Sequence, residues 1–283
     1  MRLTKILPAI LGAALWLAAV PFAQAQAPAG PIRNQEKVKI DPNGAAPPVP
    51  VNEIIRQFAA KESEFRVARG DYTYTQTVLV EDFGRTGDKQ GEYRVTSDII
   101  FTSEGKRYEK ITFAPPSSLR SFNMSPEDEK DIVNVFPFVL GTEDLPKYDV
   151  EYLGRQQVDQ IGTYVFTVRP KKLEPGQRYF QGTVWVDDQD LQIVKSFGKS
   201  VPDIHKKNEE NLFPEFETWR EQIDGKYWFP TLTRANDTLH FSSGDVGIHI
   251  SVRYTKYKRF RSTTRIISAE PVKPPEEKKP PQR

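Results

Sequence analysis

Apolar and polar residues alternate along most of the chain between residues 72 and 260. Most alternate positions are apolar or aromatic in segments such as 72–80, 93–101, 164–168 and 248–254. Alternation of this kind is typical of β-strands that bury one face. We count about eleven such segments, and short turns such as Asp224-Gly225 separate them. Short turns favour antiparallel hairpins over crossover connections.

Two segments instead have the pattern of helices. Asn52 is a candidate N-cap for a helix that extends to about Arg69. A second helix is expected from Pro126 to about residue 136, because Ser125 supplies a capping hydroxyl and acidic residues follow in the first turn. Pro137 should end it. Two helices cannot cover both faces of a large parallel sheet, so the pattern disfavours an α/β fold.

The predicted fold class is therefore α+β and mainly β. About eleven antiparallel strands exceed what one flat, twisted layer usually supports, so the sheet should curve into an incomplete β-barrel. We expect the two helices to lie over its concave face. A barrel of this size can leave room for a ligand. The polar segment 200–212 is predicted to be a loop or lid at the rim, because it is too long for a simple hairpin turn.

The two ends of the chain differ from this central part. Residues 1–25 have the charged start, apolar stretch and small residues of a secretory signal peptide, with cleavage predicted between Ala25 and Gln26. The protein is therefore expected to be periplasmic or secreted. Residues 26–50 and 268–283 are rich in proline and are predicted to be disordered spacers. One domain, residues 51–267, remains.

Composition excludes several classes of chemistry. The chain has no cysteine, which removes thiol catalysis, disulfides and cysteine-bound metals or haem. It has 40 Lys and Arg against 38 Asp and Glu, and loss of the signal peptide makes it neutral. A neutral, exported protein is not expected to bind nucleic acid.

Candidate catalytic and metal-binding residues have ordinary structural explanations. Asp187, Asp188 and Asp190 lie in a hairpin turn that lacks the glycine and distal glutamate of a calcium-binding loop. Glu217 and Glu221 are about 13 Å apart in an extended strand, which is too far for a glycosidase pair. His240 lies near Ser242 and Ser243, but without a nucleophile-elbow motif, and His205 lies in a charged loop. We therefore predict no catalytic residues, no metal and no cofactor. A secreted hydrolase built from scattered Asp, Glu and His remains an alternative.

A series of hairpins resembles a known family. The segments DYTYTQTVLVEDF, IGTYVFTVRPKK, GTVWVDDQDLQIVKSFG and IDGKYWFPTLTRA follow one another after an N-terminal helix. This order is similar to that of the LolA/LolB-like superfamily of periplasmic lipoprotein carriers, which includes outer-membrane lipoprotein-sorting proteins. The resemblance implies a curved, incomplete barrel closed by helices, with an apolar cavity for acyl chains. It also implies a non-enzymatic carrier or chaperone, with lipid or a lipidated protein as the partner.

Strand alternation then gives candidate site residues. The expected cavity lining is Tyr72, Tyr74, Val78, Tyr93, Val95, Ile99, Phe101, Tyr164, Phe166, Phe180 and Val184. The expected lid comprises Ile132, Val133, Phe136, Phe138 and Leu140. A basic stretch that contains Arg253, Lys256, Lys258, Arg259 and Arg261 could contact an anionic head group or an acidic partner, or protect an edge strand from aggregation.

These expectations leave two functions on the same fold. The first is a monomeric carrier of lipid or lipidated protein that contacts the membrane surface transiently. The second is a protein-binding or sensing module of the cell envelope, with the proline-rich ends as spacers.

Overall fold

The computed structural model describes residues 47–102, 106–203, 205–206, 209–210, 215–241 and 244–260. The predicted signal peptide with its cleavage site and the C-terminal tail lie outside these residues. So do most of the N-terminal proline-rich segment, Ser242, Ser243 and Arg261.

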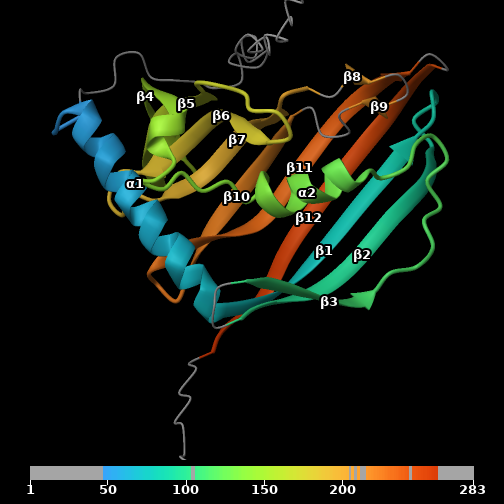
Figure 1. Cartoon of the computed structure of the whole chain (residues 1–283), viewed down its shortest axis with the longest axis horizontal. Helices are drawn as coiled ribbons and strands as arrows, with labels where there is room; N and C mark the ends of the chain where they lie inside the picture. The colour runs from blue at the N-terminus through green and yellow to red at the C-terminus, as the bar shows by residue number, and fades with distance from the viewer. Residues whose placement is uncertain are drawn as a thin grey trace, which may run out of the picture.

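Ten strands form one antiparallel, curved and unclosed sheet (Figure 1). Their order across the sheet is β3-β2-β1-β12-β11-β10-β7-β6-β5-β4. The sequence prediction of a strongly curved antiparallel sheet is confirmed. The strands are β1 (Tyr72–Phe83), β2 (Lys89–Phe101), β3 (Arg107–Phe113), β4 (Tyr148–Val158), β5 (Ile161–Pro170), β6 (Tyr179–Asp187), β7 (Ile193–Val201), β10 (Phe216–Ile223), β11 (Tyr227–Phe241) and β12 (Gly244–Arg259).

The region expected to form a rim loop contains two further strands. The pair β8 (His205–Lys206) and β9 (Glu209–Glu210) forms a separate two-stranded antiparallel sheet. The segment therefore contains a pair of short strands beyond β7, and its role as a lid at the rim stays a prediction.

Two α-helices lie on the concave side of the sheet. Helix α1 (Val51–Ala68) runs along one end, and α2 (Pro126–Asn134) lies in front of β11 and β12 (Figure 1). Short 3₁₀ turns, η2 (Arg69–Asp71) and η3 (Leu145–Lys147), lead into β1 and β4. Among the described residues, neither α-helix has the length and apolar character needed to cross a bilayer.

The sequence predicts the N-cap of α2 correctly and that of α1 wrongly. Ser125 and Asp128 form a reciprocal capping box at α2, as the Ser-Pro-Glu-Asp pattern predicts. At α1 the prediction of Asn52 as the cap was wrong. Pro50 occupies that position, and its carbonyl accepts hydrogen bonds from the amides of Glu53 and Ile54. The fixed φ of proline suits the residue before the first turn.

The main hydrophobic core lies between the concave face and the elements that cover it. Phe58 of α1 packs against Phe166 of β5, with ring centroids 5.3 Å apart. The same cluster includes Val80 of β1 and Ile250 and Val252 of β12, which lie in the other half of the sheet on the same face. A smaller cluster on the convex face surrounds Trp185. The sheet is therefore apolar along most of its concave surface, which the helices and the segment after α2 cover.

Candidate functional site

The segment after α2 lies on the concave face without forming a strand. Residues 135–140 contribute four buried apolar side chains, from Val135, Phe136, Phe138 and Leu140. Phe138 stacks on Phe180 of β6, with ring centroids 4.3 Å apart and ring planes at 25°. Phe136 lies 4.3 Å from Phe216 of β10 between ring centroids. We call residues 135–140 the plug, because they occupy the apolar surface that a cavity would otherwise expose.

Side chains, not a β-ladder, hold the main chain of the plug in place. Thr218 Oγ1 donates a hydrogen bond of 3.1 Å to the carbonyl of Phe136. Arg220 donates to the carbonyl of Phe138, and Arg66 donates to that of Val139 at 3.2 Å. Removal of the plug from the sheet would break these hydrogen bonds without disrupting the pairing of any strand.

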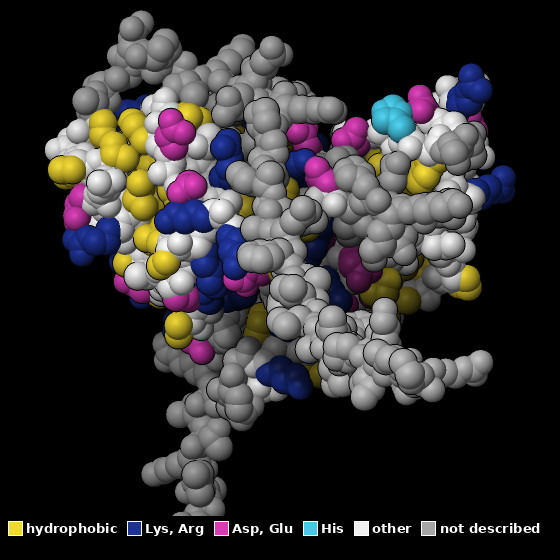
Figure 2. Space-filling view, turned by 45° about the horizontal axis from the view of Figure 1, so that its top comes forward, with side chains coloured by type: hydrophobic (Ala, Val, Ile, Leu, Met, Phe, Trp, Pro, Cys, Tyr) yellow, Lys and Arg dark blue, Asp and Glu magenta, His cyan; other side chains and the backbone are white. Residues whose placement is uncertain are grey.

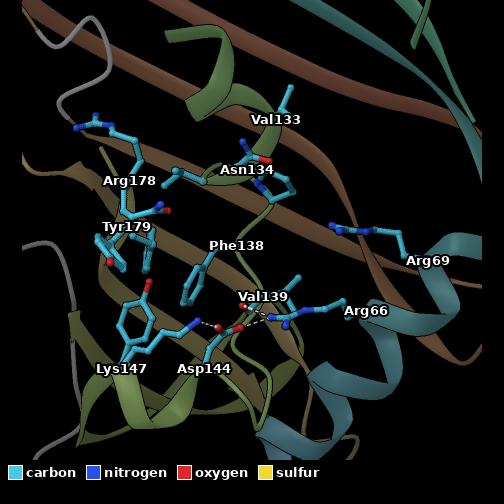
Figure 3. Close-up of a pocket in the computed structure, with 15 residues that line it drawn as sticks. Arg66, Arg69, Val133, Asn134, Phe138, Val139, Asp144, Lys147, Arg178 and Tyr179 are labelled. Atoms are coloured by element: carbon cyan, nitrogen blue, oxygen red, sulfur yellow. Dashed lines mark hydrogen bonds and ion pairs between the residues drawn. The ribbon is translucent and has the colours of Figure 1, made fainter. Parts of the chain in front are cut away.

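A partly open pocket of about 290 Å³ lies where the plug, α1, η3 and the start of β6 meet (Figure 3). Its volume is at the lower end of the range for small-molecule sites. Aromatic side chains form part of the wall, including Phe138, Tyr148, Tyr179 and Phe180. Burial raises the pKa of Tyr148, so its phenol stays protonated at neutral pH. The pocket is thus too small for a complete diacyl lipid but large enough for a polar group.

Four cationic side chains line this pocket, and three of them have carboxylate partners. Arg66 forms ion pairs with Glu143 and Asp144. Lys147 Nζ also contacts Asp144, at 2.8 Å. Arg178 forms a two-pronged pair with Asp131, with N–O distances of 2.6 and 3.0 Å. Basic and acidic side chains likewise lie close together on the face shown in Figure 2.

Arg69 is the fourth cation and differs from the others. Among the described residues, no carboxylate forms an ion pair with it. Its guanidinium lies 5.8 Å from the ring centroid of Phe101. Burial lowers the pKa of Arg69, and the positive charges of Arg220 and Arg66 lower it further, against an opposite effect of Tyr74. The pocket therefore contains a partly buried positive charge that has no counter-ion among the described residues.

A buried ion pair lies beneath the plug. Glu62 of α1 is fully buried, and its carboxylate lies 3.1 Å from Arg220 Nη1. Glu62 also accepts a hydrogen bond of 3.0 Å from the amide of Ile193. Burial raises the pKa of Glu62, against the opposing effect of Arg220. Since Arg220 also donates to Phe138, this pair connects α1, the sheet and the plug.

The structure places the predicted cavity-lining residues in the packed interior. Most are buried, and Tyr74, Tyr93 and Val95 are partly exposed. Tyr72 belongs to a separate cluster with Phe65 and Phe229. Only Phe180 borders the pocket. Their role in binding an acyl chain stays a prediction.

The predicted lid residues are covered, and the described part of the basic stretch is exposed. Ile132, Phe136, Phe138 and Leu140 are buried, and Val133 is partly buried and borders the pocket. The described residues of the basic stretch are exposed along β12, and none of them lines the pocket: Arg253, Lys256, Lys258 and Arg259. The lid and head-group roles of these two sets also stay predictions.

The acidic and histidine candidates contact other protein groups. Asp188 pairs with Arg155, and Asp190 accepts hydrogen bonds from Gln222 and Trp228. No cluster of His, Asp and Glu suited to a metal ion occurs in the described ranges.

Two further candidates also have partners. Glu217 pairs with Lys195, which lies over the rings of Trp185 and Trp219. His240 Nδ1 lies 2.8 Å from Asp245 on the exposed surface.

Sequence reasoning missed the cationic pocket. The available signal was in α1, where Glu62 interrupts the apolar stripe of Ile54, Phe58 and Phe65. A charged residue inside an apolar stripe indicates a buried partner. Arg66 and Arg69 follow it at helical spacing, one and two turns later.

No family model matches the chain, and no curated protein matches its sequence. Among solved structures, a DUF1329 family protein from Desulfovibrio piger matches 74% of this chain and 93% of its own, at 17% identity and a TM-score of 0.35. A putative outer membrane lipoprotein-sorting protein domain from Vibrio parahaemolyticus matches 72% and 93%, at 12% identity and a TM-score of 0.34. A LolA superfamily protein from Nitrosomonas europaea matches 73% and 94%, at 12% identity and a TM-score of 0.33. The matches thus include the superfamily that the hairpin segments resemble, at TM-scores below 0.5.

Proposed function

We propose that the protein is a non-enzymatic carrier that binds an acyl chain of a lipid or lipidated protein on its concave face, in place of the plug. The observation that carries this proposal is the plug itself. Four buried apolar side chains cover an apolar sheet surface through a segment that forms no strand. The resemblance of the hairpin segments to lipoprotein carriers supports the same function.

The energies of the two occupants are similar. Burial of a large apolar side chain stabilises by about 1.5–3 kcal/mol, so Val135, Phe136, Phe138 and Leu140 together contribute about 6–12 kcal/mol. A C16 acyl chain has about fourteen methylenes at about 0.8 kcal/mol each, or about 11 kcal/mol. Exchange of one for the other is therefore nearly balanced, as a carrier that must release its ligand requires.

Native mass spectrometry and a fluorescent C16 fatty acid test this function. The carrier is expected to copurify with, or take up, one or two acyl chains, and unlabelled palmitate should displace the probe. Absence of bound lipid together with no saturable binding of the probe would rule out the proposal. Broad ester, glycoside and peptide hydrolysis assays on the same sample test the hydrolase alternative.

A second candidate function, binding of an extended protein segment, is favoured by edge strand β3. Tyr108, Ile111 and Phe113 are exposed on this strand, each by more than half of its surface. Among the described strands, β3 pairs only with β2, so its other edge can accept a further strand. A protein that copurifies at fixed stoichiometry and is lost in the Ile111→Lys variant would support this function.

A further inference from the structure

We propose that the pocket beside the plug binds a phosphate group, with Arg69 as its principal ligand and Arg66 as the second. This inference rests on the proposed function in one respect: the phosphate would belong to the head group of the carried lipid. The site itself is defined by its own residues and can be tested with a water-soluble phosphate.

The balance of charge is the first argument. Four cations line the pocket, and the carboxylates paired with them are Asp131, Glu143 and Asp144. One positive charge remains uncompensated in the described part of the chain, and it lies on Arg69. A partly buried charge without a partner loses part of its hydration, and a bound anion compensates for this loss. A phosphodiester carries one negative charge and would restore neutrality.

The chemistry of the donors is the second argument. A guanidinium presents a planar set of N–H donors that match phosphate oxygens, and such charged hydrogen bonds are stronger than neutral ones. Arg66 and Arg69 both reach toward the pocket from the α1 side (Figure 3). Tyr148, whose burial keeps its hydroxyl protonated, adds an O–H group to the same wall.

The arrangement of the pocket is the third argument. Arg178 and Tyr179 lie on the other side of Phe138 from Arg66 and Arg69 (Figure 3). Arg178 is already saturated by Asp131 and the carbonyl of Pro202. On the α1 side Arg69 is an unpaired donor for an additional anion, whereas Arg66 must exchange one of its present partners, Glu143, Asp144 or the carbonyl of Val139, to become the second ligand. Phe138 belongs to both the pocket wall and the plug, so a head group held there has its acyl chains directly at the apolar surface.

Titration calorimetry on the full mature chain tests the site. The probes are sn-glycerol 3-phosphate, glycerol as its neutral counterpart, and the short-chain lipids dihexanoyl phosphatidylglycerol and dihexanoyl glycerol. We expect the two phosphates to bind, with affinity that falls as NaCl rises. The Arg69→Gln substitution should lower the affinity for both phosphate compounds by tenfold or more, and Arg69→Lys should lower it by less. The control substitution Arg85→Gln, at an exposed turn between β1 and β2, should leave both affinities within twofold of the wild-type values.

The stability of the variants keeps the test informative. Arg69→Gln removes a partly buried charge, so the free protein should unfold at the same or a higher temperature than the wild type. A clear drop in that temperature without a loss of phosphate affinity would assign Arg69 a purely structural role and overturn the proposal. The Arg69→Lys variant keeps the positive charge and serves for binding if Arg69→Gln does not fold.

The four probes and the Arg69 variants together distinguish the phosphate site from the carrier function. If both dihexanoyl lipids bind equally and Arg69→Gln has no effect, the phosphate site is refuted and acyl binding stands. If glycerol phosphate binds through Arg69 but the acyl chains add nothing to its affinity, the phosphate site stands and the carrier function loses its support. Failure of both phosphates to bind the wild type would refute the site outright.

Discussion

Replacement of Phe138 by alanine should weaken the fold and strengthen acyl binding at the same time. Phe138 is 7% exposed and stacks on Phe180. Truncation of a buried phenylalanine typically costs about 3–5 kcal/mol. For a domain of this size, about 2–4 °C of melting temperature corresponds to each kcal/mol, so a cost of about 3 kcal/mol lowers it by about 6–12 °C.

Loss of the Phe138 ring also lowers the free energy that a ligand must supply to displace the plug. If the acyl chain replaces the plug, about 3 kcal/mol less is needed to remove it, which corresponds to an increase in affinity of up to about 100-fold. Trp185→Ala is the matched control, because Trp185 is also buried but packs with Val165 and Val194 in a cluster that contains no plug residue. It should lower the melting temperature to a similar extent without any gain in affinity.

Differential scanning calorimetry and displacement of a fluorescent C16 fatty acid measure the two effects. Equal changes of affinity in the Phe138→Ala and Trp185→Ala variants would show that loosening of the fold, not removal of the plug, controls binding. Weaker binding in the Phe138→Ala variant alone would refute displacement, since Phe138 would then form part of the ligand site.

Three further predictions concern stability. Arg220→Met should cost about 3–5 kcal/mol because it leaves Glu62 buried without its partner, whereas the double variant Arg220→Met and Glu62→Leu should recover most of this loss in urea denaturation. Gly182→Ala should cost about 1–3 kcal/mol, because its Cβ would lie 2.2 Å from a backbone oxygen, whereas Gly70→Ala, with open space, should fold normally. Burial and the hydrogen bond to Asp224 raise the pKa of Tyr72 to about 12. This raised pKa stabilises the fold below about pH 10, and the contribution disappears as the pH rises toward 12, so Tyr72→Phe should flatten the fall in stability over that interval.

The elements that the sequence predicts best are those determined by local chemistry. Ser125 and Asp128 cap α2 through groups three residues apart, so the helix start could be recognised from four residues. The strand periodicity likewise follows from one buried and one exposed face. These features depend on short-range geometry and require no knowledge of distant partners.

The features that the sequence does not predict depend on irregular or distant contacts. A bulge in β12 at Lys256, which has a positive φ, interrupts the register of β1 with β12, and Tyr72 packs in a different cluster from Val78. Alternation along β1 places Tyr72 and Val78 on one face, but it cannot show a bulge in the partner strand or the distant side chains that each residue meets. Glu62 and Arg220 are 158 residues apart, so their pairing becomes evident only when the fold is known.

Arg66 connects the two proposed binding events physically. It donates to the carbonyl of Val139 in the plug and also lines the pocket in which we place the phosphate. A phosphate that recruits the Arg66 guanidinium competes with that carbonyl, so head-group binding removes one of the three side-chain hydrogen bonds that hold the plug. The acyl chain then displaces a segment that is less strongly held. Binding of the two parts of one lipid is therefore cooperative in this arrangement, because each favours the conformation in which the plug has left the sheet.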